Sequence, residues 1–399
     1  MNKFKKIYCR LFQTAFKLAI PFLPYRTPHI IHDTKVVPKL LYKKNIRNVL
    51  IITDHDIHGL RLIEPLKKTL SEHDICYTVY DKTVANPTVQ NVEEARSLYL
   101  NNCCQALIGF GGGSAMDCAK AVGARIAHPE KSVSKMKGIL KIMKKIPFLI
   151  AVPTTAGTGS ETTLATVITD EKTGHKFPIM DFALIPPIAL LDASITRTLP
   201  PYIAATTGMD ALTHAVETYI GRSTTFSSRK DALKACSLIH KNLEKACLHP
   251  HNDKARENML KASFLAGRAF SKSYVGYCHA VAHSLGGQYN IPHGLANAVI
   301  LPYILKAYDK TVYRKTKRIA IHMNLADKRT PAKTAHENLI QWIKDTNYKL
   351  GIPNKLSGIW KEDIPLLAKH AEKEANPLYP VPVLMDAKEL EQFYYHIME

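Results

Sequence analysis

The chain has 399 residues, 46% apolar and 22% charged, which is enough for two globular domains with ordinary cores. Its net charge of +20 favours anionic partners in general but identifies no specific nucleic acid. The eight cysteines form no CxxC pair, which argues against a disulfide framework or a zinc ribbon and favours a reducing, cytoplasmic location.

Residues 1–30 are predicted to form a basic amphipathic N-terminal extension. One helical face carries Lys3, Lys6, Arg10, Gln13 and Lys17, and the other carries Phe4, Ile7, Leu11, Phe12, Ala15, Leu18 and Phe22. No small-residue cleavage site follows, and no stretch reaches the about 18 apolar residues of a membrane-spanning helix. The helix is expected either to pack on the body or another subunit, or to contact an anionic membrane surface weakly.

Strand-like and helix-like segments alternate in the first half of the chain. Apolar runs at 47–53, 73–81, 104–113 and 148–155 predict strands, with helical segments between them. This order predicts a Rossmann-like α/β domain with a parallel sheet over residues 31–192. Helical periodicity dominates afterwards, which predicts an all-α domain over residues 193–399 and a boundary near 190–200.

Two loops that follow predicted strands have the composition of a nucleotide site. The first, GFGGGSAMDCAK (109–120), opens a helix whose free N–H groups suit a phosphate, although Ser114 stands where the usual dinucleotide fingerprint has its third glycine. The second, PTTAGTGSETT (153–163), is rich in glycine and hydroxyl groups. The alternatives are a tight strand-to-helix turn for the first loop and a polar turn for the second.

Acidic and histidine side chains recur at helical spacing in the second half. Asp210 and His214 are four residues apart in GMDALTHAVE (208–217), and His279 and His283 repeat that spacing in HAVAH (279–283). His293 follows in PHG. Asp210, His214, His279 and His293 would offer one carboxylate and three imidazoles to Fe(II) or Zn(II). The alternative for each histidine is a hydrogen-bonded core residue.

These motifs together resemble the iron-containing (group III) alcohol dehydrogenases. The matching segments are GGGSAMD (111–117), PTTAGTGSE (153–161), DALTH (210–214) and HAVAHSLGGQYNIPHGLANAVILP (279–302). The resemblance runs from about residue 30 to the C-terminus and implies a dehydroquinate synthase-like architecture. It also implies that Asp210, His214, His279 and His293 hold the metal, that His283 relays a proton or shapes the pocket, and that Phe270 lines the pocket.

The resemblance further implies NAD as the cofactor. Asp54 corresponds to the residue that binds the adenosine ribose, and its carboxylate would repel the 2′-phosphate of NADP. The remaining cofactor contacts that the resemblance implies are Asn86, Gly112, Gly113, Ser114, Thr154, Thr155, Thr158 and Lys176.

The reaction implied is hydride transfer between a small alcohol or aldehyde and the nicotinamide, with the metal as Lewis acid. The family also suggests a homodimer. Three alternatives stay open. They are a zinc-dependent polyol dehydrogenase of the glycerol type, a protein resembling dehydroquinate synthase, and an inactive basic protein that binds membranes or polyanions. The Asp210/His214 pair and GGGSAMD argue against the second, and the complete ligand set argues against the third.

Overall fold

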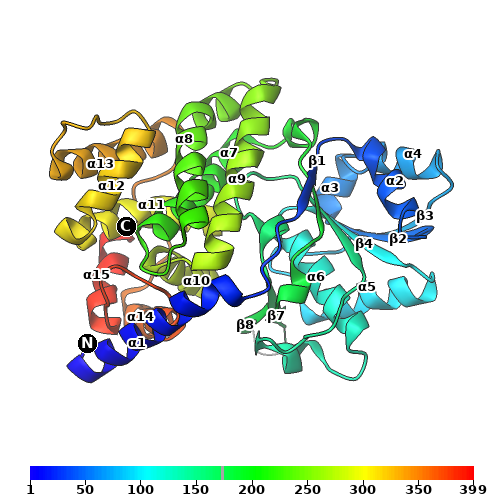
Figure 1. The fold of residues 1–399 in the computed structure, drawn as a ribbon, viewed down its shortest axis with the longest axis horizontal. Coiled ribbons are helices and arrows are strands. Elements are labelled where there is room, and N and C mark those ends of the chain that lie inside the picture. The colour runs from blue at the N-terminus through cyan, green and yellow to red at the C-terminus, as the bar shows by residue number, and fades with distance from the viewer. Residues whose placement is uncertain (172–174) are drawn as a thin grey trace. The chain divides into compact units, whose positions relative to one another are not determined.

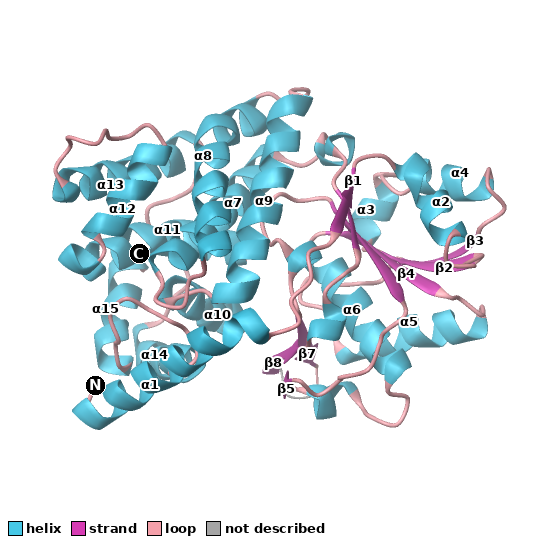
Figure 2. Ribbon diagram, in the orientation of Figure 1, coloured by secondary structure: helices cyan, strands magenta, loops and turns pink. Residues whose placement is uncertain are grey.

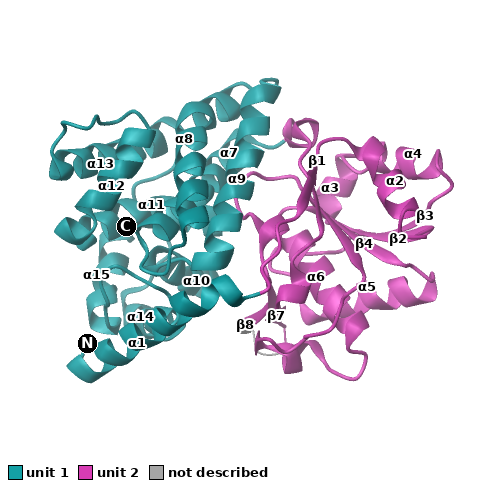
Figure 3. Ribbon diagram, viewed as in Figure 1, with its two compact units in different colours: residues 1–23, 199–399 teal, residues 24–198 magenta. Residues whose placement is uncertain are grey.

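The computed structural model describes residues 1–171 and 175–399, and its contacts divide the chain into two compact units (Figure 3). Unit 1 combines residues 1–23 with residues 199–399, and unit 2 contains residues 24–198. The change of unit after residue 198 lies within the predicted boundary region of 190–200. Residues 1–30, predicted as one extension, are divided, because 1–23 belong to unit 1 and 24–30 to unit 2.

Unit 2 is built on a six-stranded, entirely parallel sheet with the order β1-β9-β6-β4-β2-β3 (Figures 1 and 2). Its strands are β1 (His29–Ile31), β2 (Asn48–Ile52), β3 (Cys76–Tyr80), β4 (Ala106–Gly111), β6 (Phe148–Pro153) and β9 (Ile188–Leu190). This sheet confirms the predicted α/β class of the N-terminal half. The carboxyl ends of β2, β4 and β6 lie along one edge of the sheet, where parallel α/β proteins bind their ligands.

Both faces of this sheet are buried, as the apolar strand sequences require. Leu50 and Ile52 of β2 pack in the core cluster shared with α5 and α6, whereas Val49 and Ile51 point to the opposite cluster, shared with α2 and α4. The helices of the unit are α2 (Val37–Tyr42), α3 (His55–Gly59), α4 (Glu64–Ser71), α5 (Val89–Asn101) and α6 (Gly113–Ala127). A capping box at Thr88 and Asn91 starts α5.

A second, three-stranded sheet adjoins α6. Its strands have the order β5-β8-β7, with bounds β5 (Gly138–Ile139), β7 (Ala165–Asp170) and β8 (His175–Met180). β7 and β8 run antiparallel, and this places Lys176 opposite Thr169. The strand β7 contacts α6, so this sheet is packed against the helix that follows the glycine loop.

Unit 1 is helical, which confirms the predicted all-α second half. Its helices are α1 (Lys3–Ala19), α7 (Pro201–Ile220), α8 (Phe226–Leu248), α9 (Asp253–Ser273), α10 (Tyr277–Tyr289), α11 (His293–Tyr308), α12 (Tyr313–His322), α13 (Ala332–Lys349), α14 (Ile364–Ala375) and α15 (Ala387–Ile397). The central helix α7 packs against α8, α9 and α11, and α10 packs against α11 and α14. Among the described residues, no helix is both long and apolar enough to cross a membrane.

Candidate functional site

Three helices of unit 1 bring four ligand-type side chains together. Asp210 and His214 lie one turn apart on α7, His279 lies on α10, and His293 is the first residue of α11. One ligand atom from each of the four side chains lies within 4.8 Å of the others. Asp210, His214 and His279 are buried, and His293 is half-buried. The structure therefore assembles the predicted carboxylate and three imidazoles at one point.

Unsatisfied nitrogen atoms in this cluster fit a bound cation. His279 Nε2 is buried, lies 3.7 Å from Asp210 Oδ1 and has no hydrogen-bond partner among the described residues. His214 Nδ1 is also buried and has no partner within that part of the chain. A buried polar atom without a partner costs free energy, and a metal ion beside His279 Nε2 would remove that cost for this atom. The residues present thus suit a divalent transition metal.

Within the cluster, the pKa shifts of Asp210 and His214 favour a charged carboxylate and a neutral imidazole. Burial alone would raise the pKa of Asp210, but His214 and His293 beside it lower the pKa below its ordinary value. Burial lowers the pKa of His214 well below its ordinary value. A carboxylate anion and a neutral imidazole are the protonation states that bind metal ions.

Glu217 supports His279 from the side away from Asp210. Its Oε2 lies 2.6 Å from His279 Nδ1, and its carboxylate also accepts hydrogen bonds from the backbone N–H groups of Gly276 (2.8 Å) and Cys278 (2.8 Å). The side chain is buried. A carboxylate that holds Nδ1 fixes the ring orientation and leaves Nε2 to face the cluster. Sequence reasoning missed Glu217, although it lies three residues after His214 on the same helix.

Asn297 and Gly294 bring α11 against α7. Asn297 Nδ2 donates to Asp210 Oδ1 at 2.7 Å and also lies 3.0 Å from His293 Nε2. A side chain on Gly294 would place its Cβ only 2.5 Å from the carbonyl oxygen of Thr206. The absence of a side chain at Gly294 therefore permits the approach that places His293 beside Asp210. These two residues were within the recognised PHGLANA segment, but only the tertiary structure shows their roles.

Phe270 and His283, the two predicted pocket residues, both contact the ligand set. The Phe270 ring stacks on His214 with 4.2 Å between centroids, and the His283 ring stacks on His293 at 4.9 Å. Nδ1 of His283 lies 2.6 Å from Oε1 of Glu374, a residue that sequence reasoning missed. The Tyr379 hydroxyl donates to the same oxygen at 2.6 Å. His283 is thereby held beside the cluster, but it is not one of the four residues whose ligand atoms converge.

In unit 2, the two predicted nucleotide loops face one another. Gly113, the last of the three glycines, is the first residue of α6, and a Cβ there would lie 3.1 Å from Thr158 of the second loop. The backbone N–H of Thr154 donates to Gly111 O at 3.0 Å, which joins the ends of β4 and β6. Gly112 caps α6 with no side chain, so a phosphate could approach the N–H groups of the first turn.

The other predicted cofactor residues lie around these loops. Gly112 faces Thr155, whose buried Oγ1 has no hydrogen-bond partner within residues 1–171 and 175–399. Asn86 has a left-handed backbone (φ 61°), and its N–H donates to Ser114 Oγ at 3.3 Å. Lys176 lies on β8, where burial lowers its pKa.

Asp54 follows β2 at the same sheet edge. Its Oδ1 accepts a hydrogen bond from the Ile57 N–H at 2.8 Å, so the side chain caps α3. A Cβ on Gly111 would lie 3.4 Å from Asp54 Oδ2, which places the carboxylate next to the glycine loop. Burial raises the pKa of Asp54.

A buried polar network connects the two loops, and sequence reasoning missed it. Lys120 Nζ donates to Ser160 Oγ (2.9 Å), Thr163 Oγ1 (2.8 Å) and Ala165 O (2.8 Å). Asp117 Oδ1 accepts from Ser160 Oγ at 2.7 Å. Burial lowers the pKa of Lys120 to about 8 despite the nearby Asp117. Lys120 and Asp117 on α6 thus anchor the second loop. Asp117 lies three residues after GGGS and Lys120 three residues further on, and this spacing was the sequence signal that could have identified them.

Comparisons with known proteins identify the family of the chain. Residues 30–193 match the family model of iron-containing alcohol dehydrogenases, and residues 204–398 match the C-terminal model of the Fe-containing alcohol dehydrogenase family. The 1,3-propanediol dehydrogenase of Citrobacter freundii is 36% identical over 368 residues, which are 90% of this chain and 93% of the relative.

Two solved structures share the fold over nearly the whole chain. A 1,3-propanediol oxidoreductase superimposes with a TM-score of 0.89 at 32% identity, covering 94% of this chain and 98% of the other. The sulfoacetaldehyde reductase of Bifidobacterium kashiwanohense, solved in complex with NAD+, gives a TM-score of 0.82 at 27% identity and covers 94% and 98%.

The parallel sheet with its glycine loop and the Asp/His cluster define a metal-dependent oxidoreductase that uses a dinucleotide. The chain belongs to the iron-containing alcohol dehydrogenase family. It is accordingly a metal-dependent, NAD-linked alcohol dehydrogenase, and the metal implied by the family is Fe(II).

Proposed function

We propose that the protein interconverts a small alcohol and its aldehyde with NAD(H), at a metal held by Asp210, His214, His279 and His293. The observation that carries this proposal is the convergence of four ligand atoms within 4.8 Å, beside a His279 Nε2 that has no hydrogen-bond partner in the described part of the chain. When bound, the metal supplies Lewis-acid chemistry toward the substrate oxygen. The name of the Citrobacter relative supports a short alcohol or diol as substrate.

The chain's own residues have separate tasks in this proposal. Glu217 orients His279, and Asn297 orients the carboxylate of Asp210. Phe270 lies against His214 and provides an apolar wall. Oε1 of Glu374 lies 2.6 Å from Nδ1 of His283 and holds that side of the ring. Nε2 of the ring is then available to exchange a proton with the substrate.

Residues 31–192 are proposed as the dinucleotide-binding domain and residues 193–399 as the metal-binding domain. Gly112, Gly113 and Ser114 would bind the pyrophosphate at the start of α6, where the N–H groups of the first turn are available. Asp54 would accept hydrogen bonds from the adenosine ribose and thereby select NAD. The further proposed cofactor contacts are Asn86, Thr154, Thr155, Thr158 and Lys176.

The test is NADH oxidation by anaerobically purified, Fe(II)-loaded protein with a panel of short aldehydes. We expect turnover that a chelator removes and that Fe(II) restores. Parallel samples loaded with Zn(II) and offered glycerol-type polyols with NAD test the alternative of a zinc-dependent polyol dehydrogenase. If no aldehyde is reduced while metal and NADH bind, the proposed substrate class is wrong.

Three finer properties are proposed as well. Membership of the family favours a homodimer, which light scattering would detect as a mass near twice 44.6 kDa. All eight cysteines are free thiols, which favours a cytoplasmic location that cell fractionation would test. The amphipathic helix α1 favours a weak contact with a membrane surface.

A further inference from the structure

The helix α1 turns its polar side toward the protein. Gln13 is buried, and its Nε2 donates to the carbonyl of Tyr379 at 2.8 Å. The Arg10 guanidinium donates to the carbonyl oxygens of Val381 (2.7 Å) and Pro382 (2.9 Å). The amphipathic pattern in the sequence identifies two faces of this helix, but the structure shows that the one with Arg10 and Gln13 is the inner face.

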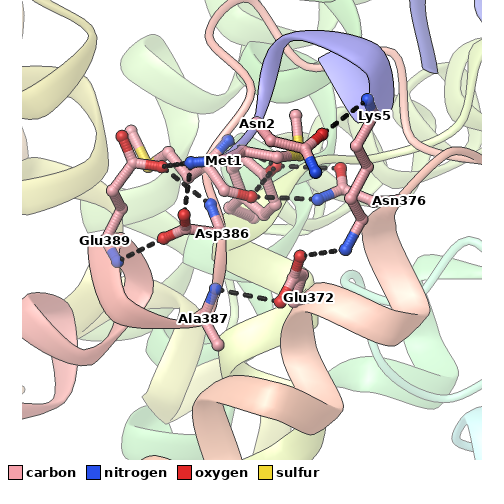
Figure 4. Close-up of polar contacts among 10 residues, drawn as sticks. Met1, Asn2, Lys5, Glu372, Asn376, Asp386, Ala387 and Glu389 are labelled. Carbon is pink, nitrogen blue, oxygen red and sulfur yellow. Dashed lines mark hydrogen bonds and ion pairs between the residues drawn. The ribbon is translucent and has the colours of Figure 1, made fainter. Parts of the chain in front are cut away.

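The start of α1 is also held by charged groups of the C-terminal helices. The ammonium group of Met1 contacts the carboxylates of Asp386 and Glu389, and Lys5 pairs with Glu372 (Figure 4). Toward its other end, the carbonyl of Gln13 accepts a hydrogen bond from Ser223 at 3.2 Å. Contacts along its length therefore fix α1 as a helix before any partner binds.

The apolar side of α1 faces away from unit 1. Phe4 is 85% exposed, Leu11 66%, Leu18 69% and Phe22, just after the helix, 87%. Successive residues of an α-helix are about 100° apart, so Leu11 and Leu18 point away from the buried Gln13 and Ile20, each two positions later. Large apolar side chains that gather on one exposed face indicate a surface that meets an apolar partner.

Charge identifies the kind of partner. Lys3, Lys6 and Lys17 are exposed on the polar side of α1 that also carries Arg10 and Gln13, and α1 contains no aspartate or glutamate. The whole chain carries a net charge of +20. A second copy would bring another chain of the same high positive charge against α1, which has no carboxylate to offset it. An anionic lipid surface instead offers an apolar layer beneath negative headgroups, which matches both features.

We propose that the outward face of α1, formed by Phe4, Ile7, Leu11, Leu18 and Phe22, docks on the surface of a membrane rich in anionic lipid. The helix lies parallel to the membrane, its apolar side chains enter the headgroup boundary, and the positive charge of α1 and of the whole chain attracts the anionic headgroups. This inference gives a lipid chemistry and an orientation to the proposed membrane contact, and it is independent of the proposed reaction.

The experiment is cosedimentation of the full-length protein with vesicles of phosphatidylcholine alone or of equal parts phosphatidylcholine and phosphatidylglycerol. We expect detectable binding only to the anionic vesicles, with a decrease at high salt. The variant Phe4→Ser/Leu11→Ser/Leu18→Ser should bind at least about tenfold more weakly. The matched control Phe226→Ser/Leu248→Ser/Tyr348→Ser removes exposed apolar side chains of α8 and α13 and should bind as the parent does.

A second pair of variants tests the charge. Lys3→Glu/Lys6→Glu/Lys17→Glu should lose binding to anionic vesicles, whereas the same change at three exposed lysines of α8, Lys234, Lys241 and Lys245, should reduce it less. NADH oxidation is measured on every preparation, so a failed dehydrogenase assay and a failed vesicle assay remain distinguishable.

Three results would overturn the proposal. The first is equal binding to both kinds of vesicle, or to neither. The second is equal loss in the α1 variants and their controls. The third is that the parent does not bind vesicles and that Phe4→Ser/Leu11→Ser/Leu18→Ser has a lower oligomeric mass than the parent. This result would assign the outward face of α1 to contact between two copies.

Discussion

Glu217 and His279 form a buried pair in which the carboxylate Oε2 lies 2.6 Å from Nδ1 of the imidazole. This contact leaves His279 Nε2 as the ring atom that faces Asp210. The protein therefore fixes one ligand of the metal cluster through a carboxylate that is not itself among the four. Glu217 is a positioning residue for the proposed metal.

Replacement of Glu217 by glutamine should weaken metal binding by about 10- to 100-fold, because the ring loses its anionic hydrogen-bond partner. Titration calorimetry with the metal ion measures this directly, without turnover. The control is Asp231→Asn, which disrupts a buried carboxylate paired with Arg268 on α8 and α9. Equal metal affinity in Glu217→Gln and the parent would show that Glu217 does not orient His279.

The two histidines of α10 should respond differently to substitution. His279→Ala removes a proposed ligand and should abolish both metal binding and turnover. His283→Ala should retain the metal but lower kcat by about 10²- to 10⁴-fold, the usual contribution of a proton-transfer group. Metal content after gel filtration and kcat of the reloaded protein separate the two. Activity retained in His279→Ala would contradict the ligand assignment.

Asp54 should determine the choice between NAD and NADP. Asp54→Ala removes the charge but also the cap of α3, whereas Asp54→Asn removes the charge and retains an acceptor for the Ile57 N–H. Both variants should raise the ratio of kcat/KM for NADP to that for NAD, by roughly tenfold for about 1.4 kcal/mol of lost repulsion. A ratio that stays at the parent value in Asp54→Asn would exclude this role.

Glu161 should make stability depend on pH. Burial raises the pKa of its carboxyl to about 7, although backbone hydrogen bonding and Lys120 oppose this. From pH 4.5 to 7 the folded protein retains a proton that the unfolded chain has lost, so the free energy of unfolding falls as pH rises through this window. Above pH 7 this loss of stability approaches roughly 3 kcal/mol, because each unit of difference between the folded and unfolded pKa is worth about 1.36 kcal/mol.

The variant Glu161→Gln lacks this titration. Near pH 4.5 its thermal unfolding temperature should be equal to or lower than that of the parent. Toward pH 8 the unfolding temperature of the variant should rise steadily relative to that of the parent. Thermal denaturation of both proteins without cofactor or metal, over this pH range, checks the sign. Parallel curves for the two proteins would mean that Glu161 does not titrate in this window.

Gly294→Ala should displace α11 from α7. The added Cβ would meet the Thr206 carbonyl at 2.5 Å, and such overpacking typically costs about 1–3 kcal/mol. Because His293 is the neighbouring residue, metal affinity should fall along with stability. Gly287→Ala is the control on α10, where a Cβ has open space and should stabilise the helix by up to about 1 kcal/mol. Calorimetric metal binding and denaturant unfolding report the two effects.

The sequence predicted the parts of the fold that have a local signal. The apolar runs at 47–53 and 104–113 contain β2 and β4, and the glycine loop does open α6. β1 and β9 were not predicted, since three residues are too few to show strand periodicity. Their pairing depends on partners about 160 residues apart along the chain, a separation that no local pattern encodes.

The candidate site shows the same division between local and tertiary information. The four-residue spacing of Asp210 and His214 places them on one helical face, and the motifs suggested which histidines would join them. Glu217 and Glu374 were missed because nothing in their local sequence indicates that they meet His279 and His283. The orientation of α1 was likewise inaccessible, since periodicity defines the two faces of a helix but not which of them finds partners.

The manner in which α1 is attached has a consequence for protein engineering. Arg10 and Gln13 bind main-chain carbonyls of Tyr379, Val381 and Pro382, so this part of the attachment depends on the path of that segment and not on which side chains it carries. Side-chain substitutions there should leave the docking intact, while a one-residue insertion should release the helix. A related enzyme whose chain follows the same path, and which has carboxylates at the positions of Glu372, Asp386 and Glu389, could therefore accept residues 1–23 as a transplanted module.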